Sequence, residues 1–384
     1  MTVAVASPVT KYADAVRDGR IVAGKWVRLA TERHLSDLAT GAVRGLRFDE
    51  EAADHAIQFF GFLHHSKGEW AGRVFKLGSW QEFVVGSLFG WQREYGRCPQ
   101  CSSWLPLDPA TLVIDCRACF APDDEEDQIP AEKGWFRRFR TSFVSTGRKS
   151  GKSTLAAGIG LLLAFFDEAP GAEVYASATK RDQAKIIWGE AQRMVKSSPE
   201  LRGEIQVLVG NLSSGNSKFM PLGADEGITG DGPNVHGNLV DELHAHKTRA
   251  MWDVLITAMG SRRQPLTFIV TTAGSDRTSI CWEQHEYGEQ VVSGVVDDDS
   301  YFVYIAAIDE EDDWRDPACW PKANPNLGVS VKLDYLTTQR DQAVSSPAKQ
   351  NTFQRLHGGR WTQQVDRWID IDLWDSQHGC VDVD

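Results

Sequence analysis

The sequence predicts a mixed α/β fold in which a mostly parallel sheet is covered by helices on both faces. Between residues 135 and 275, apolar stretches of strand length alternate with stretches whose apolar residues recur every three to four positions. Helices of that length can return the chain to the next parallel strand of a sheet. The bulk values agree, because 384 residues with 42% hydrophobic and 24% charged side chains suffice for two or three domains with a sizeable core.

The chain divides into three predicted regions. Residues 1–66 are expected to form a helical N-terminal segment, as the spacing of apolar residues in FDEEAADHAIQFFGFLHH indicates. Residues 67–295 are expected to form the sheet domain, with a small β-rich insertion at 96–121. Residues 296–384 combine the Pro- and Asn-rich stretch WPKANPNLG with a long helical stretch, and are expected to form a smaller linker subdomain.

Strands and helices alternate within the predicted sheet domain. A helix in LGSWQEFVVGSLFGW leads into the insertion. After the insertion we expect strands at 136–146, 172–178, 205–210, 237–242 and 265–274, and helices at 152–166, 180–198 and 250–260. The ligands of a parallel sheet bind beyond the carboxyl ends of its strands, so the residues that follow each strand are the candidates for a functional site.

A glycine- and lysine-rich loop, STGRKSGKST at 145–154, connects the first of these strands to the first helix. Strand, loop and helix in this order are the context of a phosphate-binding loop. Gly151 lets the backbone approach phosphate, Lys152 can reach the β- and γ-phosphates, and the Ser153 hydroxyl can hold Mg²⁺. Thr146 stands where the standard pattern has glycine, and the alternative is an ordinary helix cap with a surface lysine. The expected nucleotide ligands in the loop are Gly147, Arg148, Lys149, Ser150, Gly151, Lys152, Ser153 and Thr154.

Two acidic residues, Asp241 and Glu242, end the strand at 237–242. At the carboxyl edge of a parallel sheet both carboxylates would face the phosphate loop. Asp241 would hold Mg²⁺, and Glu242 would orient and deprotonate the attacking water. The alternative is an acidic helix N-terminus. Because His244 and His246 are two positions apart they do not share a helix face, so we interpret them as supporting or surface residues and not as metal ligands.

The strand at 265–274 ends in the small polar segment TTAGSD. Beside the acidic strand, Thr271 and Thr272 can contact the γ-phosphate or the attacking water. An ordinary strand-to-loop turn that uses Gly274 is an equal alternative.

Four of the seven cysteines form two pairs, Cys98 with Cys101 and Cys116 with Cys119, separated by fourteen residues. Two such turns can present four thiolates to one tetrahedral zinc ion, and a site without an open position is structural. Two disulfides are the alternative. The other cysteines are expected to be packing residues.

The net charge of −12 argues against a protein that coats nucleic acid, but a protein that slides along DNA can hold it through a few local basic residues. No apolar run approaches the roughly 20 residues of a membrane span. The N-terminus lacks a secretory signal pattern. The sequence therefore favours a soluble, intracellular protein.

Several of these segments together resemble the large terminase family of tailed phages, in particular its siphophage-like members. The resemblance rests on RHLSDL, KGEWAGRVFKLGSWQEFVVGSLFGW, GRKSGKS, ASATKRDQAK, VDELHAH, TTAGS and WPKANPNLG, which occur in that order along nearly the whole chain. It implies a P-loop fold of the RecA/ASCE-like type and a DNA-packaging motor that hydrolyses ATP with Mg²⁺. The resemblance also implies three partners, namely double-stranded DNA, a portal protein and a small terminase subunit, and a homo-oligomeric ring of the active protein. It implies a location in the host cytoplasm and no interaction with a membrane.

The resemblance also implies roles for individual residues. Gln81 is similar to the residue that contacts the adenine edge. Arg148 is similar to a catalytic loop arginine that replaces the usual glycine pattern, and Asp241 and Glu242 are similar to the metal-binding and water-activating pair. Thr271, Thr272, Ala273 and Gly274 resemble a segment that couples hydrolysis to movement. A ring motor of this type takes a basic residue from its neighbour, for which Arg262 and Arg263 are candidates.

Family members continue into a nuclease domain, and this chain ends near the expected junction. We therefore expect no nuclease domain and no nuclease activity, and we do not interpret Asp382 and Asp384 as metal ligands. The alternatives to a packaging motor are a helicase-like or other P-loop NTPase, or a zinc-ribbon DNA-binding or scaffold protein whose nucleotide site is inactive. A helicase would require single strands for stimulation, and a scaffold would show no ATP turnover.

Overall fold

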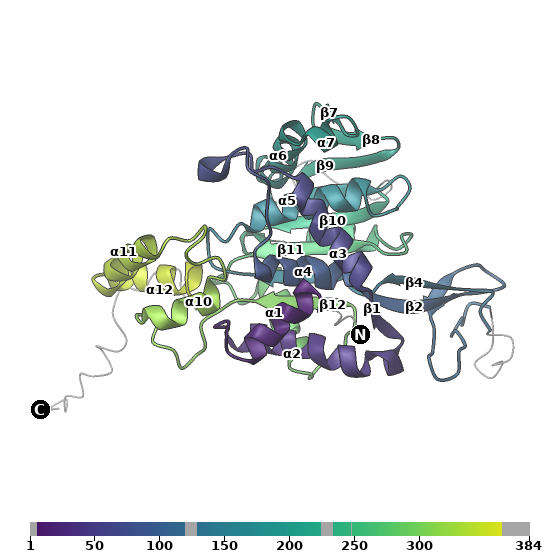
Figure 1. Cartoon of the computed structure of the whole chain (residues 1–384), viewed down its shortest axis with the longest axis horizontal. Coiled ribbons are helices and arrows are strands. Elements are labelled where there is room, and N and C mark those ends of the chain that lie inside the picture. Colours follow the sequence, from purple (N-terminus) through teal and green to yellow (C-terminus); the bar gives the residue numbers. More distant parts are fainter. Residues whose placement is uncertain (1–5, 120–128, 224–232, 247, 363–384) are drawn as a thin grey trace, which may run out of the picture.

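The computed structural model describes residues 6–119, 129–223, 233–246 and 248–362, and it is built around one large sheet (Figure 1). The sheet has eight strands in the order β12-β5-β11-β10-β6-β9-β8-β7. All neighbouring strands from β12 to β9 are parallel, and the last two pairs are antiparallel. The predicted mixed fold with a largely parallel sheet is confirmed. The strands are β5 (Thr141–Ser145), β6 (Glu173–Ala178), β7 (Gln206–Leu208), β8 (Asn211–Ser214), β9 (Ser217–Gly223), β10 (Val235–Asp241), β11 (Leu266–Thr271) and β12 (Tyr301–Ile305).

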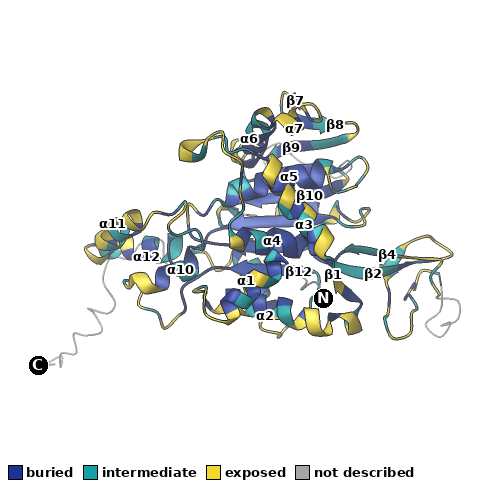
Figure 2. Ribbon diagram, viewed as in Figure 1, coloured by how far each residue is buried: buried dark blue, intermediate teal, exposed yellow. Residues whose placement is uncertain are grey.

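Helices cover both faces of this sheet, because successive strand residues point to opposite sides and both sets are apolar. In β5, Val144 packs toward the N-terminal helices while Phe143 packs toward α9. Figure 2 shows that the buried residues concentrate in this sheet and in the helices against it. The helices are α1 (Pro8–Arg17), α2 (Lys25–Thr40), α3 (Glu50–Phe59), α4 (Ser79–Gly90), α5 (Lys152–Phe165), α6 (Arg181–Ser197), α7 (Pro199–Arg202), α8 (Ala250–Thr257) and α9 (Ile280–Val292).

A second, antiparallel sheet projects from one end of the molecule (Figure 1). The predicted strand at 136–146 is in fact two strands in different sheets, since β4 ends at Arg137 and β5 begins at Thr141. Between them Arg138 is buried and donates hydrogen bonds of 2.6 Å to Asp37 and to Asp299. These distant partners fix the break in the strand. The second sheet consists of β1 (Leu46–Phe48), β2 (Trp91–Arg97), β3 (Trp104–Pro106) and β4 (Glu132–Arg137).

The described residues after β12, 306–362, form a C-terminal unit that lies at the end of the molecule opposite the second sheet (Figure 1). It has its own core, which includes Trp314, Trp320 and Phe353. The sequence prediction assigned everything after 295 to this unit, but β12 pairs with β5 and is the edge strand of the large sheet. The helices of the unit are η7 (Pro317–Cys319), α10 (Trp320–Ala323), α11 (Leu333–Val344) and α12 (Pro347–Leu356).

The hairpin β8–β9 was not predicted, although Gly215 and Asn216 at its turn are residues typical of tight hairpins. In the described part of the chain, no helix is both long and apolar enough for a bilayer crossing.

His34 on α2 is buried and neutral, and this makes stability depend on pH. The Trp91 indole donates to Nδ1 of His34 at 3.0 Å, and Nε2 lies 3.2 Å from Oγ1 of Thr10, so the neutral ring satisfies both contacts. Burial lowers the pKa of His34 to about 4; nearby Asp37 opposes this shift and Arg138 adds to it.

We expect acidification to destabilise the protein through His34. A pKa that is depressed on folding means that the unfolded chain binds the proton more tightly, so stability is full above pH 6.5 and falls as pH drops toward 4. From pH 7 to pH 5 this residue costs about 2 kcal/mol of unfolding free energy. Urea unfolding at both pH values measures the loss, and His34→Gln should reduce it by that amount. Equal pH dependence in the variant and the wild type would contradict this.

Candidate functional site

The predicted phosphate loop connects β5 to α5 at the carboxyl edge of the large sheet. Gly151, at the N-cap of α5, has φ +82°, a conformation that glycine adopts without strain. Lys149 also has a positive φ, +70°. Both conformations turn the chain tightly just before the helix begins, so the loop curls around the helix N-terminus, where unpaired N–H groups favour an anion.

Lys152 folds back over its own loop. Its ammonium donates hydrogen bonds to the carbonyl oxygens of Thr146 (2.8 Å) and Gly147 (3.0 Å). Burial lowers the pKa of Lys152 to about 8, against the opposing charges of Glu242 and Asp241. A buried cation that is held by neutral carbonyls is stabilised further when a negatively charged ligand approaches.

Ser153 and Asp241 join the loop helix to the acidic strand. The Ser153 hydroxyl donates to Oδ2 of Asp241 at 3.1 Å, across 88 positions of the chain. The other carboxylate oxygen, Oδ1, is buried and has no hydrogen-bond partner among the described residues. Burial and the charge of Glu242 raise the pKa of Asp241 to about 6, although the Ser153 hydrogen bond opposes this. A buried carboxylate oxygen without a partner beside a hydroxyl is a donor set suited to a divalent cation.

Glu242 follows the strand in a left-handed backbone conformation, with φ 50° and ψ 50°. Its carboxylate lies 3.1 Å from Nδ1 of His244, and the same ring nitrogen lies 3.1 Å from Oγ1 of Thr271. Burial raises the pKa of Glu242, but His244, Lys152 and Arg148 outweigh it and lower the pKa. His244 thus links the acidic strand to β11. His246, two residues further on, is buried.

The other predicted loop residues differ in exposure. The side chains of Arg148 and Lys149 are exposed, Thr154 is half-buried on the first turn of α5, and the Ser150 hydroxyl donates to the Gly147 carbonyl at 2.8 Å. Arg148 is close enough to Glu242 and to His357 to shift the pKa of both downward.

Gln81 and Thr272 are both buried near this edge. Gln81 Oε1 accepts a hydrogen bond of 2.9 Å from the N–H of Gly78 and caps α4. A Cβ atom at Gly151 would lie 3.7 Å from Nε2 of Gln81, so Gln81 adjoins the loop. Oγ1 of Thr272 has no partner among the described residues.

The C-terminal unit also reaches the loop, which the sequence reasoning did not predict. The N–H groups of Gly147 and Arg148 donate to the carbonyls of Ala323 (2.9 Å) and Leu356 (2.8 Å). Side chains of Asn326 and Ser330 donate to loop carbonyls as well. The only signal was the concentration of Asn and Pro in WPKANPNLG.

Arg262 and Arg263 lie at the amino end of β11, at the edge opposite the loop. Arg262 donates to the carbonyls of Pro170 and Gly171, and Arg263 lies over the rings of Trp104 and Phe136. Both therefore have structural contacts within this chain.

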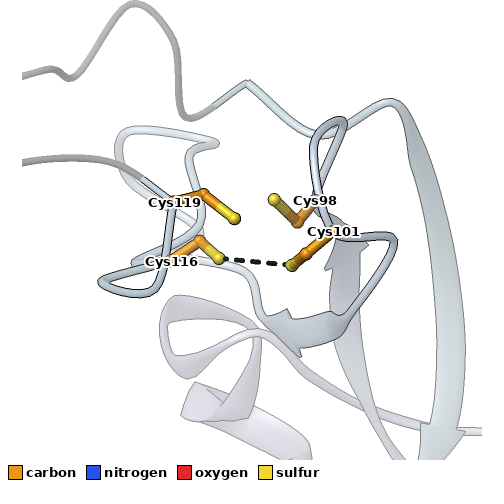
Figure 3. Close-up of side chains that lie close together, drawn as sticks. All are labelled: Cys98, Cys101, Cys116 and Cys119. Atoms are coloured by element: carbon orange, nitrogen blue, oxygen red, sulfur yellow. Dashed lines mark hydrogen bonds between the residues drawn. The ribbon is translucent and has the colours of Figure 1, made fainter.

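The four clustered cysteines lie in the two loops that flank β3 of the second sheet. Figure 3 shows their sulfur atoms turned toward one point, and all four lie within 4.8 Å of one another. The Sγ atoms of Cys101 and Cys116 are 3.7 Å apart. Sulfurs placed about 2.3 Å from one tetrahedral zinc ion are about 3.8 Å apart, so the cluster can hold that ion. Cys281 and Cys319 are buried, as packing residues should be, and Cys380 lies outside the described residues.

Two consecutive segments match models of one protein family. Residues 132–290 match the ATPase domain of the terminase large subunit, and residues 295–383 match its endonuclease domain. The second match contradicts our expectations that the chain has no nuclease domain and that nuclease activity is absent. Those expectations rested on where the chain ends, and its last residues, including Asp382 and Asp384, lie outside the described part.

Known proteins are similar to parts of the chain. Protein YmfN of Escherichia coli (strain K12) is 37% identical over 147 residues, which cover 38% of this chain and 32% of YmfN. The large terminase subunit of Enterobacteria phage HK97 is 24% identical over 247 residues, which cover 61% of this chain and 47% of that protein. The similarity therefore spans about a third to a half of the length of these relatives.

The crystal structure of the HK97 bacteriophage large terminase has the same fold. It aligns with a TM-score of 0.61 and 19% identity, over 80% of this chain and 55% of that one. With the ATPase and endonuclease models matching in succession, and the phosphate loop and acidic pair at one edge of the sheet, the chain belongs to the terminase large subunit family.

Proposed function

We propose that this chain is the ATP-hydrolysing motor of a phage terminase, which drives double-stranded DNA into the procapsid. The observation that carries the proposal is the hydrogen bond between Ser153 and Asp241, because it brings the phosphate loop and the acidic strand together at one edge of the sheet. The family match supports the DNA-packaging role.

Binding of the triphosphate follows from the chemistry of the loop. The first N–H groups of α5 and the Lys152 ammonium supply positive charge, and Gly151 has no side chain to block the approach. On binding, Lys152 exchanges two neutral carbonyl acceptors for charged phosphate oxygens, which are stronger partners. Gln81, which adjoins the loop, is the proposed contact to the base.

Ser153 and Asp241 are the proposed ligands of Mg²⁺. Their fit rests on the buried, unpaired Oδ1 of Asp241 and on the hydroxyl that already contacts Oδ2. When bound, the ion neutralises charge on the β- and γ-phosphates.

Glu242 is the proposed residue that orients the attacking water. Its lowered pKa keeps the carboxylate ionised at neutral pH, and His244 and Thr271 hold its neighbourhood in place. The same carboxylate is the proposed acceptor of a proton from this water. The exposed Arg148 guanidinium lies close enough to Glu242 to lower its pKa, and it is the proposed group that stabilises charge developing on the γ-phosphate. Thr271 and Thr272 are the proposed link from phosphate release to β11.

Hydrolysis that depends on double-stranded DNA would test this function. Phosphate release by the purified chain should rise several-fold with linear double-stranded DNA and less with single strands of equal length. Stimulation by single strands alone would instead indicate a helicase. No turnover under any of these conditions, with portal and small subunit present, would refute the motor. A ring of identical subunits and contacts with those two partners belong to the same proposal.

The cysteine cluster is proposed to hold a structural zinc ion. The four thiols form a closed set with no position left for a substrate, and the cluster sits on a small sheet with only a small core of its own. Metal binding can supply the folding free energy that such a small core lacks.

Loss of zinc should unfold this end of the molecule and leave the nucleotide site intact. We expect about one zinc per chain by elemental analysis, and less than a tenth of that in Cys116→Ser. The variant should be cleaved by protease between residues 98 and 119 yet bind ATP as the wild type does. Cys319→Ser, which changes a buried cysteine outside the cluster, is the matched control. Full zinc content in Cys116→Ser would contradict the assignment.

A further inference from the structure

Two side chains of the C-terminal unit hold carbonyl oxygens of the phosphate loop. Asn326 Nδ2 donates to the Ser150 carbonyl at 2.8 Å, across 176 positions of the chain. Ser330 Oγ donates to the Lys149 carbonyl at 2.7 Å. These two carbonyls belong to consecutive peptide groups, the ones that end at Gly151 and at Ser150.

Holding a carbonyl also fixes the N–H of the same peptide group. The chain has no cis peptide among its described residues, and in a trans peptide the C=O and N–H bonds point in opposite directions. With the carbonyls of Lys149 and Ser150 directed at the C-terminal unit, the N–H groups of Ser150 and Gly151 are directed away from it. Successive backbone N–H groups that share one side of a loop can form an anion-binding concavity.

The amide of Asn326 is itself held in one orientation. The indole of Trp80, one residue before Gln81 on α4, donates to Oδ1 of Asn326 at 2.8 Å. Because Oδ1 accepts from Trp80, Nδ2 must face the Ser150 carbonyl. Trp80 is buried and stacks on Tyr304, so this anchor is rigid.

We propose that Asn326 and Ser330 are positioning residues for the nucleotide phosphates, supplied by the segment that matches the endonuclease domain. They touch no phosphate themselves, and they act by orienting the N–H groups of the loop. This inference rests on the proposed binding of ATP at the loop and extends it by assigning part of that site to residues beyond the matched ATPase domain.

The test compares dissociation constants for Mg²⁺-ATP and for Mg²⁺-tripolyphosphate, measured by calorimetry on the full chain. Asn326→Ala should weaken both ligands about fivefold to tenfold, which corresponds to the loss of one net hydrogen bond. Asn326→Asp fills the same volume but turns a carboxylate toward the Ser150 carbonyl, so it should weaken both at least as much. Ser330→Ala should weaken both about threefold, and it carries the test if the Asn326 variants do not fold.

Two comparisons separate positioning from a general structural effect. Gln81→Ala should weaken binding of ATP but not of tripolyphosphate, because its proposed contact is with the base. Asn234→Ala removes an amide that joins Ser261 and Arg262 at the opposite edge of the sheet, and it should leave both constants within twofold of the wild type. The double variant Trp80→Phe with Asn326→Ala should bind no more weakly than Asn326→Ala alone, since Trp80 acts through Asn326.

The failures of the two proposals can be told apart. If the wild type binds ATP and the Asn326 and Ser330 variants bind both ligands within twofold of it, the positioning role is wrong and the nucleotide site stands. If the wild type binds neither ligand, the proposed function fails and this inference fails with it.

Discussion

Replacing Lys152 by alanine is expected to reduce DNA-stimulated ATP hydrolysis about a thousandfold, the scale of losing a principal electrostatic contact to the transition state. The ammonium is buried, donates to two loop carbonyls and lies close enough to Glu242 and Asp241 for their charges to raise its pKa, so an exposed lysine cannot replace it. The affinity for ATP should fall as well, because the loop N–H groups alone must then bind the phosphates. Phosphate release and equilibrium binding measure the two effects.

A matched control separates the role of this lysine from a loss of positive charge. Lys185→Ala removes an exposed lysine on α6 that forms an ion pair with Asp182, and its hydrolysis rate should equal that of the wild type. Thermal unfolding should show that Lys152→Ala remains folded, because the change removes a desolvated charge. Wild-type turnover by Lys152→Ala would exclude the loop as the site of hydrolysis.

Glu242→Gln should lower kcat by a factor of roughly 10²–10⁴ while ATP binding changes little. Glutamine has the shape of glutamate but cannot accept a proton from water or carry the charge that orients it. The variant should therefore accumulate bound ATP, which rapid-quench measurement in a single turnover would detect.

The control for this variant is Glu283→Gln, an exposed glutamate on α9 that pairs with Arg249. This substitution removes the same charge from a residue that is not at the carboxyl edge of the sheet, so kcat should remain unchanged. If Glu242→Gln turned over at the wild-type rate, another group would have to activate the water. If Glu242→Gln lost ATP binding, Glu242 would contribute to binding of ATP and not to the hydrolysis step.

The main features of the sheet and its edge were predictable because they follow from local patterns. The residues at 145–154 specify the strand, turn and helix of a phosphate loop, and an apolar run ending in Asp241 and Glu242 specifies a strand with acids at its carboxyl end. Parallel strands bring such ends to one edge, which is where Ser153 meets Asp241. The roles of these residues in catalysis remain predictions until the variants are measured.

Other features depend on contacts that no local pattern contains. The break between β4 and β5 requires Arg138 to be buried against Asp37 and Asp299, which come from two distant segments. The apolar pattern of β12 predicts a strand, but it does not indicate whether that strand joins the large sheet or belongs to a separate domain. Asn326 and Ser330 reach the loop only because the chain returns to it after more than 170 residues. Each of these depends on the tertiary arrangement, which periodicity and propensity do not determine.

The pairing of β12 with β5 has a practical consequence for work with shorter pieces of this protein. A fragment that ended at residue 290, where the match to the ATPase domain ends, would lack β12 and leave the backbone of β5 without a neighbour on one side. Such an open edge, flanked by the apolar Phe143 and Val144, invites association with other chains. Low solubility or weak turnover in that fragment would reflect the missing strand and not the chemistry of the enzyme.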